Sequence, residues 1–389
     1  MKTNPVFTFH IPTKLFFGCG ELDRLATEQL PGKKAMIVIS AGTAMKKYGY
    51  LELVGKKLAK QEIEYVVFDK ITANPRKKEV MQAAAFAREH NCDFVVGLGG
   101  GSSIDAAKAA AMMAVNDGDL WDYAGGGSGK GLRPSGALPL VAIPTTSGTG
   151  TEIDHAAVIT NEETQEKIGL HYECLYPFMA IVDPRLMISI PPHLTAFQGF
   201  DAFFHAAEGF LSKRANPTSD LFALEAVRLL YKYLPVAVMN GRDLKARAKV
   251  AWAATLGGMV LATSGCASLH GMEHAMSAKY PKLPHGTGLI ALSKEYFDKF
   301  RNDKVKRLMK MADEMNEAPS ARPFDFIIAL DRMMTQCGVA DIRLSKYGIK
   351  EEDLEGFVRE AQHTSRSFEV DPRRLSDEEI LEIYKKSYK

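Results

Sequence analysis

Four side chains with the chemistry of metal ligands lie in two segments of the chain. Asp201 and His205 are four residues apart, and His270 and His285 lie in a stretch that begins 65 residues after His205. On a helix, residues four apart share a face, so the carboxylate of Asp201 and the imidazole of His205 would point into the same space. One oxygen and three nitrogens can hold a divalent transition metal and leave a coordination position open. A metal placed there polarises an alcohol or a carbonyl group.

A fourth histidine accompanies the second segment. His274 follows His270 by one helical turn, and His285 stands between proline and glycine, which would hold the backbone at a bend. Residues 270–274 read HGMEH, with the acid at the fourth position. In the HExxH motif of zinc proteases the acid stands at the second position, so this segment gives no special support for a protease. A lone histidine is more often structural than a ligand. Three within sixteen residues, beside an Asp/His pair, favour a metal.

The pattern of the first half of the chain predicts a sheet. Short apolar runs alternate with helical patterns, which predicts a parallel sheet covered by helices on both faces. The predicted strands are residues 35–39, 64–68, 93–98, 138–143 and 179–182, and the helices between them include 78–90 and 103–115.

After residues 191–192, both proline, the strand signals nearly vanish. Stretches rich in Ala, Leu and Met predict helices over residues 195–213, 219–238, 244–264, 270–279 and 289–315, with more helices from 323 onward. A chain of 389 residues exceeds what one hydrophobic core usually serves. We therefore predict an α/β Rossmann-like domain over residues 1–187 and an all-α domain over residues 188–389. Ligands commonly bind in a cleft between such halves.

Composition narrows the class of ligand. The net charge is +2, from 49 basic and 47 acidic residues, which indicates neither a nucleic-acid surface nor a polybasic membrane patch. The five cysteines are an odd number without a CxxC pair, which favours free thiols in a reducing cytoplasm. The N-terminus lacks an apolar signal region, and the longest apolar run, near residues 250–262, is too short to span a bilayer. We expect a cytoplasmic protein with a small-molecule ligand.

A glycine-rich segment, residues 97–105, follows an apolar strand and opens a helix. Glycines let a backbone approach a diphosphate, and the helix N-terminus offers free N–H groups and a positive dipole. The pattern is not the full GxGxxG, because Ser102 stands where the last glycine would be. The alternative is a tight turn with Ser103 as the N-cap.

Two other loops call for opposite interpretations. Residues 144–152 follow a strand and hold five hydroxyls within seven residues, which can donate to phosphate, ribose or amide groups; the alternative is a solvated turn. Residues 125–131 only superficially suggest a P-loop. Ala124 stands where the first glycine belongs, and Gly131 replaces the Ser or Thr that would hold magnesium, so we predict a mobile surface loop there.

Together these segments resemble the iron-dependent (group III) alcohol dehydrogenases, especially the butanol-dehydrogenase-like and lactaldehyde-reductase-like members, over almost the whole chain. The matching residues are Gly99, Gly100, Gly101, Ser102, Asp105 and Lys108; Pro144 to Thr149 with Glu152; Asp183-Pro184; Asp201 to His205 with Glu208; His270 to His274; and Pro284 to Gly286. The resemblance implies the dehydroquinate synthase-like architecture of that family, with an α/β and an all-helical domain.

The resemblance also implies roles for individual residues. Asp201, His205, His270 and His285 would bind the metal, and His274 would lie near the nicotinamide and relay protons, so that the catalytic set is His274, Asp201 and His270. The residues implied for cofactor binding are Ser40, Gly42, Asn74, Gly99, Gly100, Gly101, Ser102, Asp105, Thr145, Thr146, Ser147, Thr149 and Lys167. In many relatives fourteen residues separate the histidines matching His270 and His285, whereas here the step is fifteen.

The implied reaction is hydride transfer between NAD(P)(H) and a small primary alcohol or aldehyde bound to Fe²⁺ or Zn²⁺, in a homodimer. NAD-preferring enzymes often place an acid where the ribose hydroxyls lie, because its charge repels a 2′-phosphate. Residues 40–47, after the first predicted strand, contain no acid. We therefore expect NADP(H) to be accepted and preferred.

Two alternatives stay open at this point. One is a metal- and NAD-dependent lyase or synthase of the dehydroquinate-synthase type, which needs several cations to clamp an acidic, phosphorylated substrate. The segments around Asp201 and His270 are mostly apolar, with Lys279 and Lys282 the only nearby cations, so a neutral substrate fits better. The other is a non-catalytic scaffold, against which the intact set of four ligand types argues.

Overall fold

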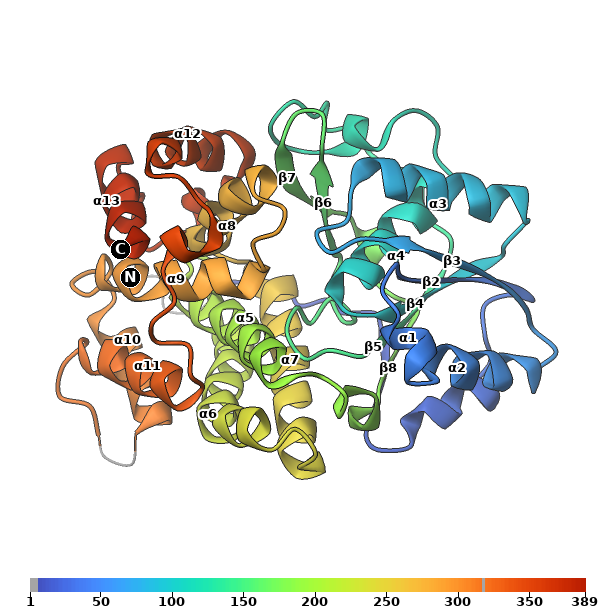
Figure 1. The fold of residues 1–389 in the computed structure, drawn as a ribbon, viewed down its shortest axis with the longest axis horizontal. Helices are drawn as coiled ribbons and strands as arrows, with labels where there is room; N and C mark the ends of the chain where they lie inside the picture. The colour runs from blue at the N-terminus through green and yellow to red at the C-terminus, as the bar shows by residue number, and fades with distance from the viewer. Residues whose placement is uncertain (1–5, 317–318) are drawn as a thin grey trace. The chain divides into compact units, whose positions relative to one another are not determined.

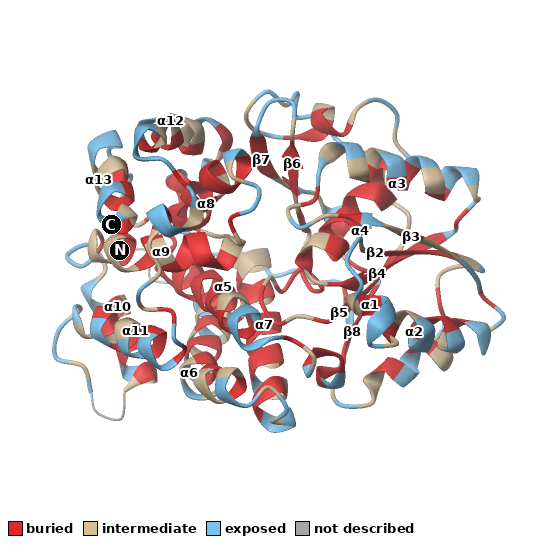
Figure 2. Ribbon diagram, viewed as in Figure 1, coloured by how far each residue is buried: buried red, intermediate tan, exposed pale blue. Residues whose placement is uncertain are grey.

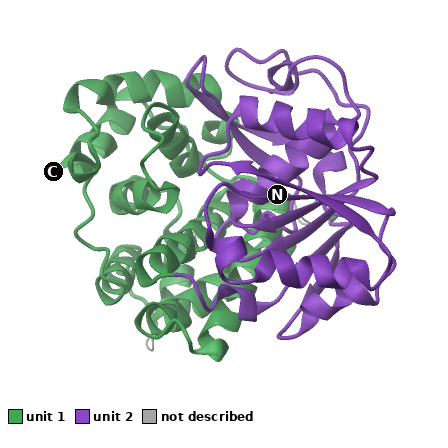
Figure 3. Cartoon of the chain, turned by 45° about the vertical axis from the view of Figure 1, so that its right-hand side comes forward, with its two compact units in different colours: residues 1–10, 191–389 green, residues 11–190 purple. Residues whose placement is uncertain are grey.

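The computed structural model describes residues 6–316 and 319–389, and the chain divides into two compact units (Figure 3). One unit comprises residues 11–190 and the other residues 191–389 together with residues 6–10. Each unit has hydrophobic core clusters of its own. The predicted boundary at residues 187 and 188 lies close to this division, and the separate function assigned to each domain stays a prediction.

The first unit contains a six-stranded, wholly parallel sheet in the order β1-β8-β5-β4-β2-β3 (Figure 1). Its strands are β1 (Lys14–Phe17), β2 (Lys34–Ser40), β3 (Glu64–Ile71), β4 (Phe94–Gly99), β5 (Leu140–Pro144) and β8 (Met179–Val182). The helices of this unit are α1 (Ala44–Lys47), α2 (Tyr50–Ala59), α3 (Lys77–Glu89) and α4 (Gly101–Met113). The predicted parallel sheet of Rossmann type is confirmed.

Both faces of the sheet are covered, as the period of two in a strand requires. Along β2, Met36 and Val38 join a buried cluster with residues of α3 and α4. The alternate residues Ala35, Ile37 and Ile39 join a second cluster with residues of α2. The interior of this unit is therefore two apolar layers separated by the strands, and Figure 2 shows β2 and β4 as buried between helices that expose their outer faces.

Three strands were not predicted: β1, β6 (Ala156–Asn161) and β7 (Glu166–His171). The last two form a separate antiparallel hairpin. β6 (AAVITN) is a short apolar run, but β7 (EKIGLH) begins with Glu166 and Lys167, which are charged and yet buried. The carboxylate of Glu166 accepts hydrogen bonds from Trp121 Nε1 (2.9 Å) and from Ser128 N (2.7 Å) and Oγ (2.5 Å). The glycine-rich loop at residues 125–131 is thus fastened to this hairpin.

The second unit is helical. Its helices are α5 (Pro192–Leu211), α6 (Pro217–Met239), α7 (Leu244–Ser264), α8 (Ser268–Lys279), α9 (His285–Asp298), α10 (Val305–Met315), α11 (Asp325–Gln336), α12 (Leu354–Thr364) and α13 (Asp377–Tyr388). The single helix predicted over residues 289–315 was wrong. The polar run at residues 301–304 closes a turn, with Lys304 N donating to Phe300 O (3.1 Å), and divides the segment into α9 and α10.

An aromatic cluster fixes α5 within this unit. Phe203 stacks on Phe326 of α11 with ring centroids 6.2 Å apart, and Phe204 meets Phe297 of α9 at 6.1 Å. All four side chains are fully buried. Phe203 and Phe204 are therefore core residues, and the opposite face of α5 is left for the polar residues of the site.

No single helix in the described parts of the chain is long and apolar enough to cross a membrane; only α7 and α8 taken together, with a 104° bend between them, meet the length and hydropathy test. The cysteines Cys19, Cys92, Cys174, Cys266 and Cys337 are free thiols.

Candidate metal centre and cofactor loops

Helix α5 carries Asp201, His205 and Glu208 on one face, because steps of four and three residues return to the same side of a helix. Residues 199–211 are all buried. Polar side chains in so buried a helix need partners, since unpaired polar groups are costly away from water. The three residues therefore define a polar stripe in an otherwise apolar helix.

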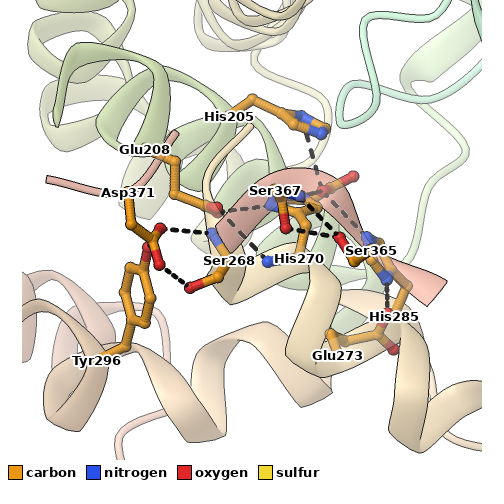
Figure 4. Close-up of polar contacts among 11 residues, drawn as sticks. His205, Glu208, Ser268, His270, Glu273, His285, Tyr296, Ser365, Ser367 and Asp371 are labelled. Atoms are coloured by element: carbon orange, nitrogen blue, oxygen red, sulfur yellow. Dashed lines mark hydrogen bonds and ion pairs between the residues drawn. The ribbon is translucent and has the colours of Figure 1, made fainter. Parts of the chain in front are cut away.

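Helix α8 carries His270, Glu273 and His274, and α9 begins at His285. The N-terminus of α8 is held by a residue that is distant in the sequence (Figure 4). Asp371 accepts hydrogen bonds from Ser268 N (2.9 Å) and Oγ (2.6 Å), and from the hydroxyl of Tyr296 on α9 (2.9 Å). A carboxylate at a helix N-terminus satisfies its free N–H groups. Burial raises the pKa of Asp371 to about 7.

The three ligand-type histidines converge on one oxygen. Asp201 Oδ1 lies 3.3 Å from His270 Nε2, 3.5 Å from His285 Nε2 and 3.7 Å from His205 Nδ1. Metal–nitrogen and metal–oxygen bonds of about 2.0–2.2 Å place tetrahedral ligand atoms roughly 3.3–3.6 Å apart. Donor atoms of Asp201, His270 and His285 lie within 4.8 Å of one another, a spacing that a single small cation can span, whereas His205 meets that spacing with His270 and Cys266. The structure brings the predicted histidines near Asp201, and their role as metal ligands stays a prediction.

Two buried carboxylates hold the imidazoles from behind. Glu208 Oε1 lies 2.5 Å from His270 Nδ1, and Glu273 Oε2 contacts His285 Nδ1 (Figure 4). Both glutamates are fully buried. A metal-ligating histidine usually donates its other ring N–H to such a partner, which leaves the lone pair on the ligating nitrogen. Here that arrangement directs the Nε2 atoms of His270 and His285 toward Asp201.

The electrostatics of this cluster favour a positive charge at its centre. Burial alone raises the pKa of Asp201, but the charge of His205 and the hydrogen bonds of the other imidazoles outweigh it and hold the pKa well below its ordinary value. Burial lowers the pKa of His270, but Cys266, Glu208 and Asp201 raise it well above the usual range. Both shifts have the sign expected where a positive charge among these carboxylates is favourable, and a divalent ion would supply such a charge.

His274 lies at the side of this cluster. Its ring centroid is 5.5 Å from that of His285 and 6.4 Å from that of His270. The additional residue between His270 and His285 is taken up by the turn after α8, where Leu283 N donates to Tyr280 O (2.9 Å). The longer step therefore leaves His285 within reach of Asp201.

The two predicted cofactor loops lie together in the α/β unit. Gly99 ends β4 with φ +148°, and Gly100 is the N-cap of α4. Thr145 N donates to Gly99 O (2.8 Å). A Cβ on Gly101 would stand 2.4 Å from Thr149 Cγ2. Only glycine permits this approach, and the result is a helix N-terminus with a bare backbone beside a row of hydroxyls, which suits a diphosphate.

The other predicted cofactor residues surround the same sheet. Ser40 ends β2, Gly42 lies in the bend that follows, and Ser102 lies in the first turn of α4. Lys167 Nζ donates to Asn74 Oδ1 (3.0 Å), so these two predicted residues are neighbours. Their contact with a cofactor stays a prediction.

Asp105 is used within the protein. It is buried, and its two oxygens accept hydrogen bonds from Thr151 Oγ1 (2.6 Å) and Val158 N (2.9 Å). This geometry makes Asp105 a support for the threonine-rich loop. Thr145, Thr146 and Ser147 lie on that loop, and Ser147 Oγ is 2.9 Å from the sulfur of Met187. A cofactor role for each of them stays a prediction.

Sequence reasoning assigned no role to Glu208, Glu273 or Cys266. The first two had a detectable signal, since each lies three residues after a predicted ligand on the same helix. Cys266 lies in the loop before α8, where no periodicity applies, and only the folded chain places it near the histidines.

Comparison with known proteins identifies the family. Residues 12–184 match the profile described as iron-containing alcohol dehydrogenase, and residues 195–388 match that of the Fe-containing alcohol dehydrogenase family, C-terminal. The NAD-dependent methanol dehydrogenase of Bacillus methanolicus is 33% identical over 385 residues, which cover 97% of this chain and 98% of that protein. The 1,3-propanediol dehydrogenase of Citrobacter freundii is 32% identical, covering 98% and 99%.

Solved structures agree with these matches. An archaeal halo-thermophilic alcohol dehydrogenase from a Red Sea brine pool superposes with a TM-score of 0.94 at 32% identity, over 99% of this chain and 100% of that one. The NADH-dependent butanol dehydrogenase A of Thermotoga maritima gives a TM-score of 0.88 at 28% identity, covering 99% of each chain. The resemblance inferred from the motifs is confirmed, and the chain belongs to the iron-containing alcohol dehydrogenase family.

Proposed function

We propose that this alcohol dehydrogenase binds its divalent metal through Asp201, His205, His270 and His285. The observation that carries the proposal is the convergence of three imidazole nitrogens within 3.3–3.7 Å of Asp201 Oδ1. One carboxylate and three imidazoles suit iron(II) and zinc. The reaction is hydride transfer between a nicotinamide and a small primary alcohol or aldehyde, and the names of the methanol, 1,3-propanediol and butanol dehydrogenases support that substrate class.

The residues of the helical unit have distinct tasks in this reaction. A bound divalent cation supplies Lewis acidity toward the oxygen of an alcohol or a carbonyl group. Glu208 and Glu273 keep the Nδ1 atoms of His270 and His285 protonated, so that the Nε2 lone pairs stay available. Oxidation of an alcohol releases one proton besides the hydride, and His274, beside His285, is placed to accept it.

The α/β unit supplies the dinucleotide site under this proposal. The bare backbone at Gly100 and Gly101 takes the diphosphate, and the adjoining hydroxyls of Thr146 and Thr149 contact it or the ribose. Both NAD(H) and NADP(H) are accepted, with NADP(H) preferred, because residues 40–47 contain no acid to repel a 2′-phosphate. The ratio of kcat/KM for the two cofactors tests the preference, and a strong advantage for NAD(H), as the names of two relatives suggest, contradicts it.

Metal reconstitution tests the site itself. Metal-free protein is loaded with iron(II), the bound metal is measured, and oxidation of both reduced nicotinamides is followed with butyraldehyde. We expect one ion per chain and activity only after loading. Full activity in metal-free protein would contradict the proposal. The dehydroquinate-synthase alternative is not favoured, because both halves of the chain match the alcohol dehydrogenase family.

A further inference from the structure

A thiol lies beside the proposed metal ligands. Cys266 belongs to the short connection between α7 and α8, where Gly265 adopts φ +71° and turns the chain. One donor atom from each of His205, Cys266 and His270 falls within 4.8 Å of the others. The rings of His205 and His270 are stacked with centroids 4.4 Å apart, so both imidazoles border the thiol.

We propose that Cys266, His205 and His270 form a second donor set, which holds a thiophilic divalent cation such as zinc or cobalt(II). Thiolate sulfur is a soft ligand and, with imidazole nitrogens, favours zinc, whereas a carboxylate is a hard ligand. The inference rests on the proposed function in one respect only, since it shares two histidines with the four-residue set.

The two sets compete for the same imidazoles. His270 belongs to the group with Cys266 and His205 and also to the group with Asp201 and His285. Two cations sharing that imidazole would repel one another strongly at such a short separation. One ion therefore occupies the cluster at a time, on the carboxylate side or on the thiol side. The identity of the metal decides which side is filled.

Cobalt(II) reports on sulfur coordination directly, because a thiolate ligand gives an intense near-ultraviolet charge-transfer absorption that nitrogen and oxygen ligands do not. The full-length, metal-free protein is titrated with cobalt(II). We expect the absorption in the unmodified protein and in His285→Ala, and its loss in Cys266→Ser. Cys19→Ser is the matched control, because Cys19 is an exposed thiol and its removal should leave the absorption unchanged. Circular dichroism verifies that each variant is folded.

Metal affinities give the second measurement. Cys266→Ser should weaken zinc binding by at least about tenfold and leave iron(II) binding unchanged, because the loss of a ligand costs at least as much as the loss of its supporting partner. Absence of the absorption from the unmodified protein, its survival in Cys266→Ser, or equal zinc affinity in both proteins would overturn the inference. These results leave the four-residue set unaffected; it fails if His285→Ala retains iron(II) binding or if metal-free protein is fully active.

Discussion

The two units each bury a cluster of charged side chains, and the clusters differ in the source of their positive charge. In the α/β unit, Lys108 Nζ donates three hydrogen bonds of 2.8 Å, to Asp154 Oδ1, Asp154 O and Ala156 O. All three donors of the ammonium group are thereby used. In the helical unit, Asp201 is paired with imidazoles of three different helices. The first cluster contains its own cation and ties a helix to a hairpin. Under the proposed function, the second presents donor atoms to a cation from outside.

Removing an imidazole should have the largest effect. His270→Ala takes a ligand from both proposed donor sets, so we expect a loss of metal affinity well above about 100-fold, the upper range for residues that merely support a ligand. Activity should fall in parallel, while the α/β unit stays folded. Metal analysis after dialysis and the circular dichroism spectrum check the two halves of this prediction. If His270→Ala keeps its metal, the histidine cluster is not the metal site, and the two clusters would then not differ in the source of their positive charge.

Removing the lysine should instead lower the free energy of unfolding. Lys108→Met leaves Asp154 buried without its cation, which costs about 3–5 kcal/mol in the free energy of unfolding. Urea denaturation measures this cost, and metal affinity should not change, because the site belongs to the other unit. Lys279→Met is the control, since its ion pair with Asp353 is exposed and worth less than about 1 kcal/mol. Equal effects of the two substitutions would show that the buried pair has no special role.

The supporting glutamates should have an intermediate effect. Glu208→Gln and Glu273→Gln keep the size of the side chain but remove the charge that orients each imidazole, so metal affinity should fall by about 10–100-fold in each variant. Competition with a chelating dye provides the measurement. Glu89→Gln, the same substitution at an exposed position of α3 in the α/β unit, should have no effect on that affinity. Unchanged affinity in both glutamate variants would show that packing alone orients the histidines.

The smallest expected effect is on the pH dependence of stability, to which Asp105, near Lys108 in the α/β unit, contributes. Burial raises the pKa of Asp105 from 3.8 to about 6, although Lys108 opposes the shift. Between about pH 4 and 6 the folded state therefore holds a proton on Asp105 that the unfolded state has released. The stabilisation that this proton gives is complete below about pH 4 and is lost as the pH rises through 6. The slope is at most about 1.4 kcal/mol per pH unit. Asp105→Asn should flatten that slope in urea denaturation between pH 4 and 7, and an unchanged slope would exclude Asp105 as its source.

The contrast between the clusters also explains how far the sequence could lead. Asp201 and His205 were predictable because a four-residue step on one helix is a local property. The central strands were predictable because buried parallel strands are continuous apolar runs. Strand β7 was missed because the buried charges of Glu166 and Lys167 conceal it.

Long-range pairing accounts for the rest of the site. The contact between Glu273 and His285 joins two helices across a turn, and Cys266 approaches the histidines only through the bend at Gly265. No spacing rule relates such residues, since their distance depends on how α8 and α9 pack. Sequence patterns therefore predicted the candidate ligands, and the helix packing shows which side chains contact them.

The cap of α8 has a consequence for biosynthesis. Asp371 follows Ser268 by 103 residues, so the helix that carries His270 lacks its N-terminal partner until residue 371 has been synthesised and has left the ribosome. A growing chain would expose these histidines before it could arrange them, and we expect metal to be acquired after release. Asp371→Asn, assayed for bound iron, should take up less, because the start of α8 loses its carboxylate partner; full uptake would show that the late carboxylate is dispensable.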